Sequence, residues 1–124
     1  MAREVYMPSL NRLELIGNCG SEPELRFTPS GKPVCTFSVA TNYVVNEESK
    51  AEWHNIVTWN KLAETCNQFL QKGQQVFVEG RLQTRTWEGD DGVKHYKTEV
   101  IANRVLFLGQ RKQEETTEET SEEF

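Results

Sequence analysis

Two tryptophans stand where flat rings could stack on the bases of a nucleic acid. Along one expected strand the side chains alternate between two faces, so Trp53 and Trp59 share a face, with Asn55 between them. Two such rings belong either to a core or to an exposed platform. Ile56 already gives the opposite face an apolar side chain, and Lys61 follows closely, which favours the platform. Stacking tolerates any sequence, because every base has a π-face.

The third ring, Trp87, lies close to an expected turn, which is an unusual place for a core residue. Pairing of Trp87 with Tyr96 across the hairpin would hold its two arms together, and this role does not exclude stacking on a base. Basic residues on the same hairpin would follow a phosphate backbone by charge, so binding should weaken strongly with salt. The polar and basic residues around the turn are Arg81, Arg85, Lys94, His95 and Lys97.

The sequence offers little for catalysis or metal binding. Cys19, Cys35 and Cys66 occur singly and form no C-x-x-C pair, which argues against a zinc site or a disulfide framework. His54 and His95 lie on different expected elements without ligands at metal spacing, and His54 is expected to be a packed or interface residue. We therefore expect no enzyme, no catalytic residue, no metal and no cofactor.

Charge divides the chain into two parts. Residues 1–112 hold all 14 Lys and Arg and 13 of the 19 Asp and Glu, whereas residues 113–124 hold six Glu and no basic residue. The net charge of −5 therefore comes from a C-terminal tail that is too polar to fold alone and is expected to be disordered. Phe124 with Glu122 and Glu123 forms an anionic and aromatic end, which is either a partner-binding epitope or part of a solubilising tail.

Strands are the elements that must hold the rings. Alternating, β-branched and aromatic stretches separated by turn residues predict five of them. A cluster of turn formers at 28–33 implies a hairpin-like return, 47–52 is expected to be a loop, and 88–92 a turn between two long strands. The expected strands are 13–16, 35–41, 53–59, 76–87 and 93–108.

One helix is expected between the third and fourth strands. Apolar residues recur at helical spacing, with Asn60 placed to cap the start and Gly73 to stop the end. This order is typical of an all-β fold, the five-stranded OB barrel with one helix between strands 3 and 4. An SH3-like barrel has no helix there, and a ferredoxin-like fold needs one after its first strand. The expected apolar stripe is Leu62, Ala63, Cys66, Phe69 and Leu70.

No signal peptide or membrane span is visible in the sequence, and the single cysteines suit a reducing compartment. We therefore expect a soluble, cytoplasmic protein.

The residues also resemble a known family, the bacterial single-stranded DNA-binding proteins, which have one OB domain and an acidic tail. The resemblance covers about residues 10–108, and with the division of charge described above it gives an OB domain at 1–112 and a tail at 113–124. It rests on Asn11-Arg12-Leu13 leading into Ile16-Gly17-Asn18, on the segments 23–31, 37–42, 53–64 and 78–85, and on Lys72-Gly73.

This resemblance implies a nucleoid-associated homotetramer that binds single-stranded DNA without sequence preference and protects it during replication, recombination and repair. Its stacking positions fall on the three tryptophans already named. It also implies that His54 lies at subunit contacts and that the C-terminal end recruits replication and repair proteins. The residues matching its phosphate contacts are Arg12, Lys61, Lys72 and Arg85.

Two departures from the family pattern stand out. Family members often carry an aromatic residue shortly after the Ala-Thr of strand two, and Tyr43 stands close to that place but out of register. They usually end in aspartates, proline and phenylalanine after a long linker, whereas this linker is short and Glu123 takes the place of the proline. The alternatives are a dimeric accessory OB protein of primosomes or conjugation, and a protein-interaction module that uses the aromatic face.

Overall fold

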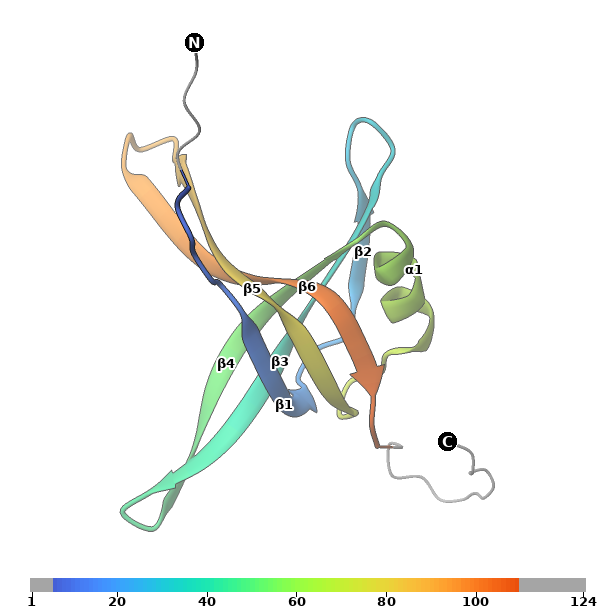
Figure 1. Cartoon of the computed structure of the whole chain (residues 1–124), viewed down its shortest axis with the longest axis vertical. Coiled ribbons are helices and arrows are strands. Elements are labelled where there is room, and N and C mark those ends of the chain that lie inside the picture. Colours follow the sequence, from blue (N-terminus) through green and yellow to red (C-terminus); the bar gives the residue numbers. More distant parts are fainter. Residues whose placement is uncertain (1–5, 110–124) are drawn as a thin grey trace.

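The computed structural model describes residues 6–109, which fold into strands and one helix (Figure 1). The predicted tail and the domain boundary after residue 112 lie outside these residues. The elements are β1 (Leu13–Cys19), β2 (Glu24–Phe27), β3 (Pro33–Val45), β4 (Glu48–Trp59), α1 (Asn60–Phe69), β5 (Gln75–Glu88) and β6 (Lys94–Phe107).

Five strands form a closed barrel in the order β1-β5-β6-β4-β3, and pairing of β1 with β3 at Asn18↔Ala40 and Cys19↔Val39 completes the ring. The pairing of β4 with β6 is parallel and the other pairings are antiparallel. The helix lies between the third and fourth barrel strands in chain order. The predicted five-stranded OB fold is therefore confirmed.

β2 is a short additional strand that pairs with the first residues of β3 outside the barrel order. The turn between them is held by Thr28, whose Oγ1 accepts a hydrogen bond from the backbone N–H of Lys32 at 3.0 Å. Turn formers in the sequence predicted this return, whereas the strand itself was missed. Four residues paired along a single edge carry too little alternation to be read from sequence.

Alternate strand residues point inward and form the core. The side chains of Val39, Ile56, Val76 and Val78 are fully buried, and Val100 is nearly so. Full burial of such a side chain contributes about 1.5–3 kcal/mol to folding. Because neighbouring residues along a strand point to opposite faces, this inward set fixes which side chains are left outside.

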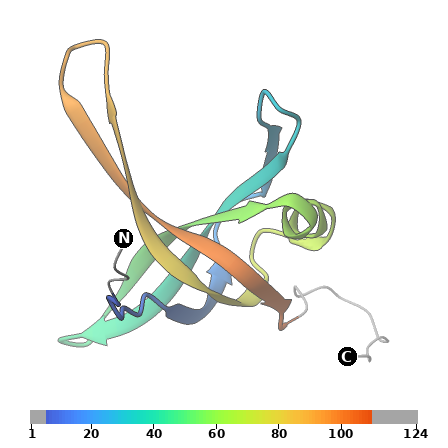
Figure 2. The ribbon, with the colours of Figure 1, turned by 45° about the horizontal axis from the view of Figure 1, so that its top comes forward.

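Two hairpins extend beyond the barrel as long arms, one of β3 and β4 and one of β5 and β6 (Figures 1 and 2). The prediction of a loop at 47–52 was wrong, because β4 begins at Glu48. A two-residue turn with positive φ at Asn46 and Glu47 (49° and 63°) joins the strands of the first arm directly. Polar residues on a solvated arm show no apolar alternation, which made this strand look like a loop.

The helix α1 covers the core with Ala63 and Cys66, and Leu70, the residue after its end, is also buried, as the spacing predicted. Phe69, predicted for the same stripe, is 55% exposed, because the helix ends there and Leu70 is extended. Asn60 is the first helical residue and not the cap, since Trp59 holds the cap position without a side-chain hydrogen bond. Within residues 6–109 no helix is long and apolar enough to cross a membrane.

Gly80 lies where β5 leaves the barrel and continues into its arm. The register between β5 and β6 shifts between Glu79 and Gly80, which marks a β-bulge. A Cβ at Gly80 would collide with the carbonyl oxygen of Ile101 and lie 2.8 Å from Cα of Ala102. Only glycine allows this approach of two backbones.

Gly80→Ala is therefore expected to lower the free energy of unfolding by about 2 kcal/mol or more, because backbone atoms must move apart. Urea unfolding followed by circular dichroism measures the change. Gly109→Ala is the matched control, since the nearest atom to its Cβ would be 3.6 Å away. Equal stability of the two variants would contradict a tight crossing at Gly80.

Candidate nucleic-acid interface

Trp53 and Trp59 lie on the outer face of β4, as their alternation predicted. Their side chains are 57% and 39% exposed, while Ile56 and Thr58 point into the barrel and are fully buried. The hydroxyl of Thr58 donates to the carbonyl of Cys35 at 2.8 Å, so this inward polar group is satisfied. The alternative that both tryptophans belong to the core is excluded by their exposure.

Gly20 provides the space that the ring of Trp53 occupies. A Cβ at Gly20 would collide with Cζ3 of this ring and lie 2.7 Å from Cη2. The backbone N–H of Gly20 donates to the carbonyl of Ser38, and the Ser38 N–H donates to Oγ of Ser21, at 2.9 and 3.1 Å. These bonds fix the backbone beside the indole. This role of Gly20 could not be predicted from the sequence, because its neighbour in the fold is 33 positions away.

A groove of about 340 Å³ runs over the part of β4 between the two tryptophans. Ser38 of β3 and Asn55 of β4 line it with polar side chains. Its charge is mixed, so the groove is not a simple basic channel. The charged residues along it are Glu22, Glu24, Arg26, Arg85, Lys97 and Glu99.

Trp87 lies on the β5–β6 arm, 42% exposed, with contacts to two other side chains. Its ring stacks on His95, with centroids 5.6 Å apart and planes inclined by 23°, and Cζ of Arg85 lies 4.9 Å from the ring centroid. The cross-strand partner is thus His95 and not Tyr96, which stands opposite Thr86 and on the other face of the arm.

Arg85, one of the predicted phosphate contacts, is bound to a carboxylate of its own chain. Its Nη2 lies 3.2 Å from Oε2 of Glu99 and its Nε 3.4 Å from Oε1, which is a two-pronged ion pair. Glu99 is only 9% exposed. In this conformation Arg85 joins the two strands of the β5–β6 arm on the face that carries Trp87, so a phosphate contact would require exchange of the carboxylate.

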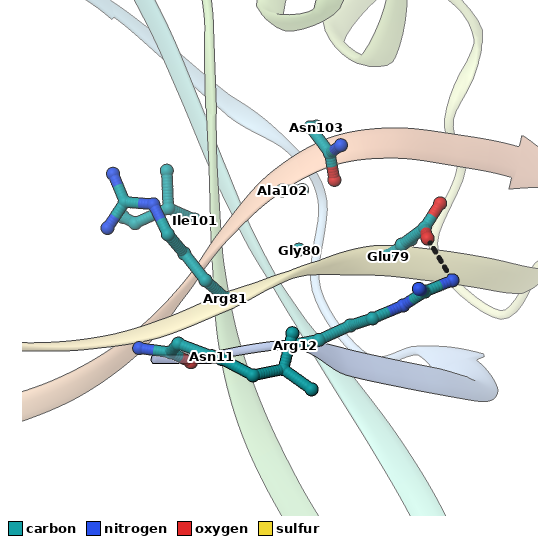
Figure 3. Close-up of a pocket in the computed structure, with 9 residues that line it drawn as sticks. Asn11, Arg12, Glu79, Gly80, Arg81, Ile101, Ala102 and Asn103 are labelled. Atoms are coloured by element: carbon teal, nitrogen blue, oxygen red, sulfur yellow. Dashed lines mark hydrogen bonds and ion pairs between the residues drawn. The ribbon is translucent and has the colours of Figure 1, made fainter. Parts of the chain in front are cut away.

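Arg12, another predicted phosphate contact, lies in a second groove of about 540 Å³ (Figure 3). Its Nη2 is 2.8 Å from Glu14 and 2.9 Å from Glu79, whose other oxygen lies 3.6 Å from Arg104. Beside it, Asn11 donates to the carbonyl of Leu82 and accepts from its N–H, at 2.8 and 3.0 Å. Figure 3 shows Arg12 directed along β5 toward Glu79. This site is distinct from the groove between the tryptophans.

The two predicted lysines are exposed at either end of the helical segment. Lys61 lies in the first turn of α1, two residues after Trp59, and Lys72 lies in the turn that follows the helix. Lys61 makes no ion pair among residues 6–109. Its position places a positive charge close to the exposed ring of Trp59 in the chain.

His54 and Tyr43 lie on the face opposite the tryptophans. Strand register pairs His54 with Val39, and Nε2 of His54 lies 3.0 Å from Oγ1 of Thr41. This half-buried histidine is packed, as expected from its position. Tyr43, 45% exposed, shares its face by alternation along β3, so it does not point toward the rings of β4.

The cysteines contribute no nucleophile. Cys19, Cys35 and Cys66 are buried and unpaired, and burial raises the pKa of each thiol, that of Cys66 to about 12. Within residues 6–109 no group of three or more His, Cys, Asp or Glu side chains is placed to hold a metal ion. Among the described residues, the features that could bind a ligand are the exposed aromatic rings, the two grooves and the charged side chains at the surface.

Comparison with known proteins relates this chain to a protein family. The profile of the single-strand binding protein family matches residues 10–108. A single-stranded DNA-binding protein of Neisseria meningitidis serogroup A is 44% identical over 108 residues, covering 83% of this chain and 62% of the relative. Single-stranded DNA-binding protein 1 of Xylella fastidiosa is 42% identical over 111 residues, covering 85% of this chain and 82% of the relative. The chain thus spans about 62% of the length of its Neisseria relative.

A solved structure shows the same fold. The chain in a structure described as the Plasmodium falciparum SSB complex with ssDNA superposes with a TM-score of 0.76 at 34% identity, over 85% of this chain and all of that one. The matched residues 10–108 of the family profile include every strand and the helix.

Proposed function

Because the chain belongs to the single-strand binding protein family, we propose that it binds single-stranded DNA without sequence preference. The observation that carries the proposal is the pair of exposed rings, Trp53 and Trp59, on either side of a groove on β4. Rings on a strand whose other face is the core are held rigidly. Stacking on them is worth about 1–3 kcal/mol per base.

The bound strand follows the groove from β4 toward the β5–β6 arm, where Trp87 supplies a third ring. Asn55 and Ser38 line the floor of the groove with groups that hydrogen-bond to bases or sugars. Such contacts tolerate any base where water mediates them, so stacking and not base readout sets the affinity.

Phosphate contacts come from four cations in this proposal, and they fall into two pairs. Lys61 and Lys72 contact the backbone directly from the surface beside α1. Arg12 and Arg85 contact it only after exchanging the carboxylates of Glu79 and Glu99 for phosphate. Each contact formed contributes about −0.7 to the slope of log affinity against log salt.

The wider role that fits this activity is protection of single strands during replication, recombination and repair, at the nucleoid. Covering bases with protein rings prevents both re-annealing and nuclease attack. No catalytic step is part of this proposal.

For an assembly of four copies, one of the subunit contacts is proposed on the outer face of β1, β5 and β6. Ile16, Phe77 and Leu106 stand opposite one another in register across these strands. Ile16 and Leu106 are 55% and 40% exposed, and Arg104 covers the ring of Phe77 at 5.7 Å. A row of apolar side chains across three strands fits a second copy of the same face. His54 is proposed as a further subunit contact.

Partner recruitment is proposed for Glu122, Glu123 and Phe124, which lie outside the described residues. An apolar ring beside several carboxylates suits a pocket that combines an apolar floor with basic residues.

Substitution of each stacking ring tests the DNA-binding proposal. Trp53→Ala, Trp59→Ala and Trp87→Ala should each weaken binding to oligo-dT by about 1–3 kcal/mol, because one base loses its stacking partner. Quenching of the remaining tryptophan fluorescence, measured at several salt concentrations, reports the affinity. Tyr96→Ala is the matched control, since this exposed ring lies on the other face of the arm. Wild-type protein that shows no quenching would refute the proposal, and variants that unfold would make the rings structural.

Introduction of charge on the proposed interface tests assembly. Leu106→Glu combined with Ile16→Glu should convert the tetramer into smaller species, because each association would have to remove carboxylates from water. Light scattering during size-exclusion chromatography measures the mass. Val44→Glu is the control, since this 71% exposed residue lies on the other arm. A wild-type dimer would support the accessory-protein alternative instead.

Deletion of Phe124 tests the tail. The variant should lose its replication and repair partners in a pull-down and keep its affinity for oligo-dT, because the rings that bind DNA lie elsewhere. Thr117→Ala serves as a control within the tail. Undiminished capture of partners would leave the tail only a solubilising role.

A further inference from the structure

One face of the β5–β6 arm carries a continuous series of contacts that ends in a histidine. Glu99 pairs with Arg85, the guanidinium of Arg85 lies over Trp87, and Trp87 stacks on His95. Nε2 of His95 lies 3.8 Å from Oδ1 of Asp91 in the turn. The proposed third stacking ring is therefore in contact with a side chain that can change its charge.

The position of His95 places it beside any base that stacks on Trp87. The two residues face each other across the strands, and their rings are 5.6 Å apart and inclined by only 23°. The histidine side chain is 44% exposed, so a ligand can reach it. A base and its phosphate on the indole would lie within reach of the imidazole, which extends the flat surface of the arm.

The charges that face His95 come from both strands and the turn. Asp91 is the nearest charged residue. Arg85 contacts the same indole ring that His95 stacks on, and Lys97 lies two residues further along β6 on the same face. Glu88 and Lys94 pair across the strands on the opposite face. In a complex, a phosphate can replace the carboxylate of Asp91 as the charged neighbour of the imidazole.

We propose that His95 is a further DNA contact whose protonation makes the affinity of the Trp87 arm depend on pH. Histidine changes its charge between about pH 5 and 8. The neutral imidazole adds only flat surface to the indole, whereas the imidazolium adds a positive charge that pairs with a phosphate. Affinity gained in this way is present at low pH and lost as the pH rises. This inference rests on the proposed binding of single-stranded DNA.

The test measures the affinity for oligo-dT by fluorescence at about pH 5.5 and about pH 8, each over a range of salt concentrations. Wild-type protein should bind several-fold more tightly at the lower pH, and its salt slope should be steeper there by about 0.7, the value of one added phosphate contact. His95→Gln should lose this difference in slope. His95→Arg, which keeps a charge at both pH values, should show the steeper slope at both.

Tyr96→Gln is the matched control, because it changes the next residue of the arm on the opposite face and should retain the pH dependence of the wild type. An equal change in slope with pH in His95→Gln and wild type would overturn the inference. Absence of binding by the wild type at about pH 8 would instead refute the proposed function, so the two failures are distinguishable.

Discussion

Closure of the sheet is the constraint on which the rest of the structure depends. β1 pairs with β5 along one edge and with β3 at Asn18 and Cys19, so the five strands leave no free edge between them. The crossing is tight, since a Cβ at Gly17 would collide with the carbonyl oxygen of Ala40. A closed barrel has one inside and one outside. Once Ile56 and Thr58 point inward, alternation turns Trp53 and Trp59 outward, where they are 57% and 39% exposed.

Features that depend on local alternation could be predicted from the sequence. The two faces of β4, the long hairpin and the helix between them follow from side-chain periods of two and of three to four residues. The ends of elements could not be predicted equally well. Asn60 and Phe69 have suitable types and spacing, yet the helix begins and ends so that neither does what its pattern indicates.

Pairs formed across the fold were beyond reach of the sequence. Arg12 meets Glu79 across 67 positions and Arg85 meets Glu99 across 14, and nothing in a single sequence connects such partners. Both arginines match positions that contact phosphate in the family, so both were predicted to bind DNA. The structure shows that each neutralises an acid of its own chain. The type of a residue predicts its charge, but only the fold determines which group that charge interacts with.

The arms explain why an isolated chain exposes so much apolar surface. A two-stranded ribbon has no second layer to bury its side chains and is only marginally stable in water. On the β3–β4 arm, Tyr43, Val44 and Val45 are 45%, 71% and 40% exposed. On the β5–β6 arm, aromatic stacking and the Arg85–Glu99 pair replace a core. Contact with other copies or with a bound DNA strand would cover the exposed side chains of such arms and stabilise them. The proposed assembly and DNA binding would therefore stabilise the same arms that make these contacts.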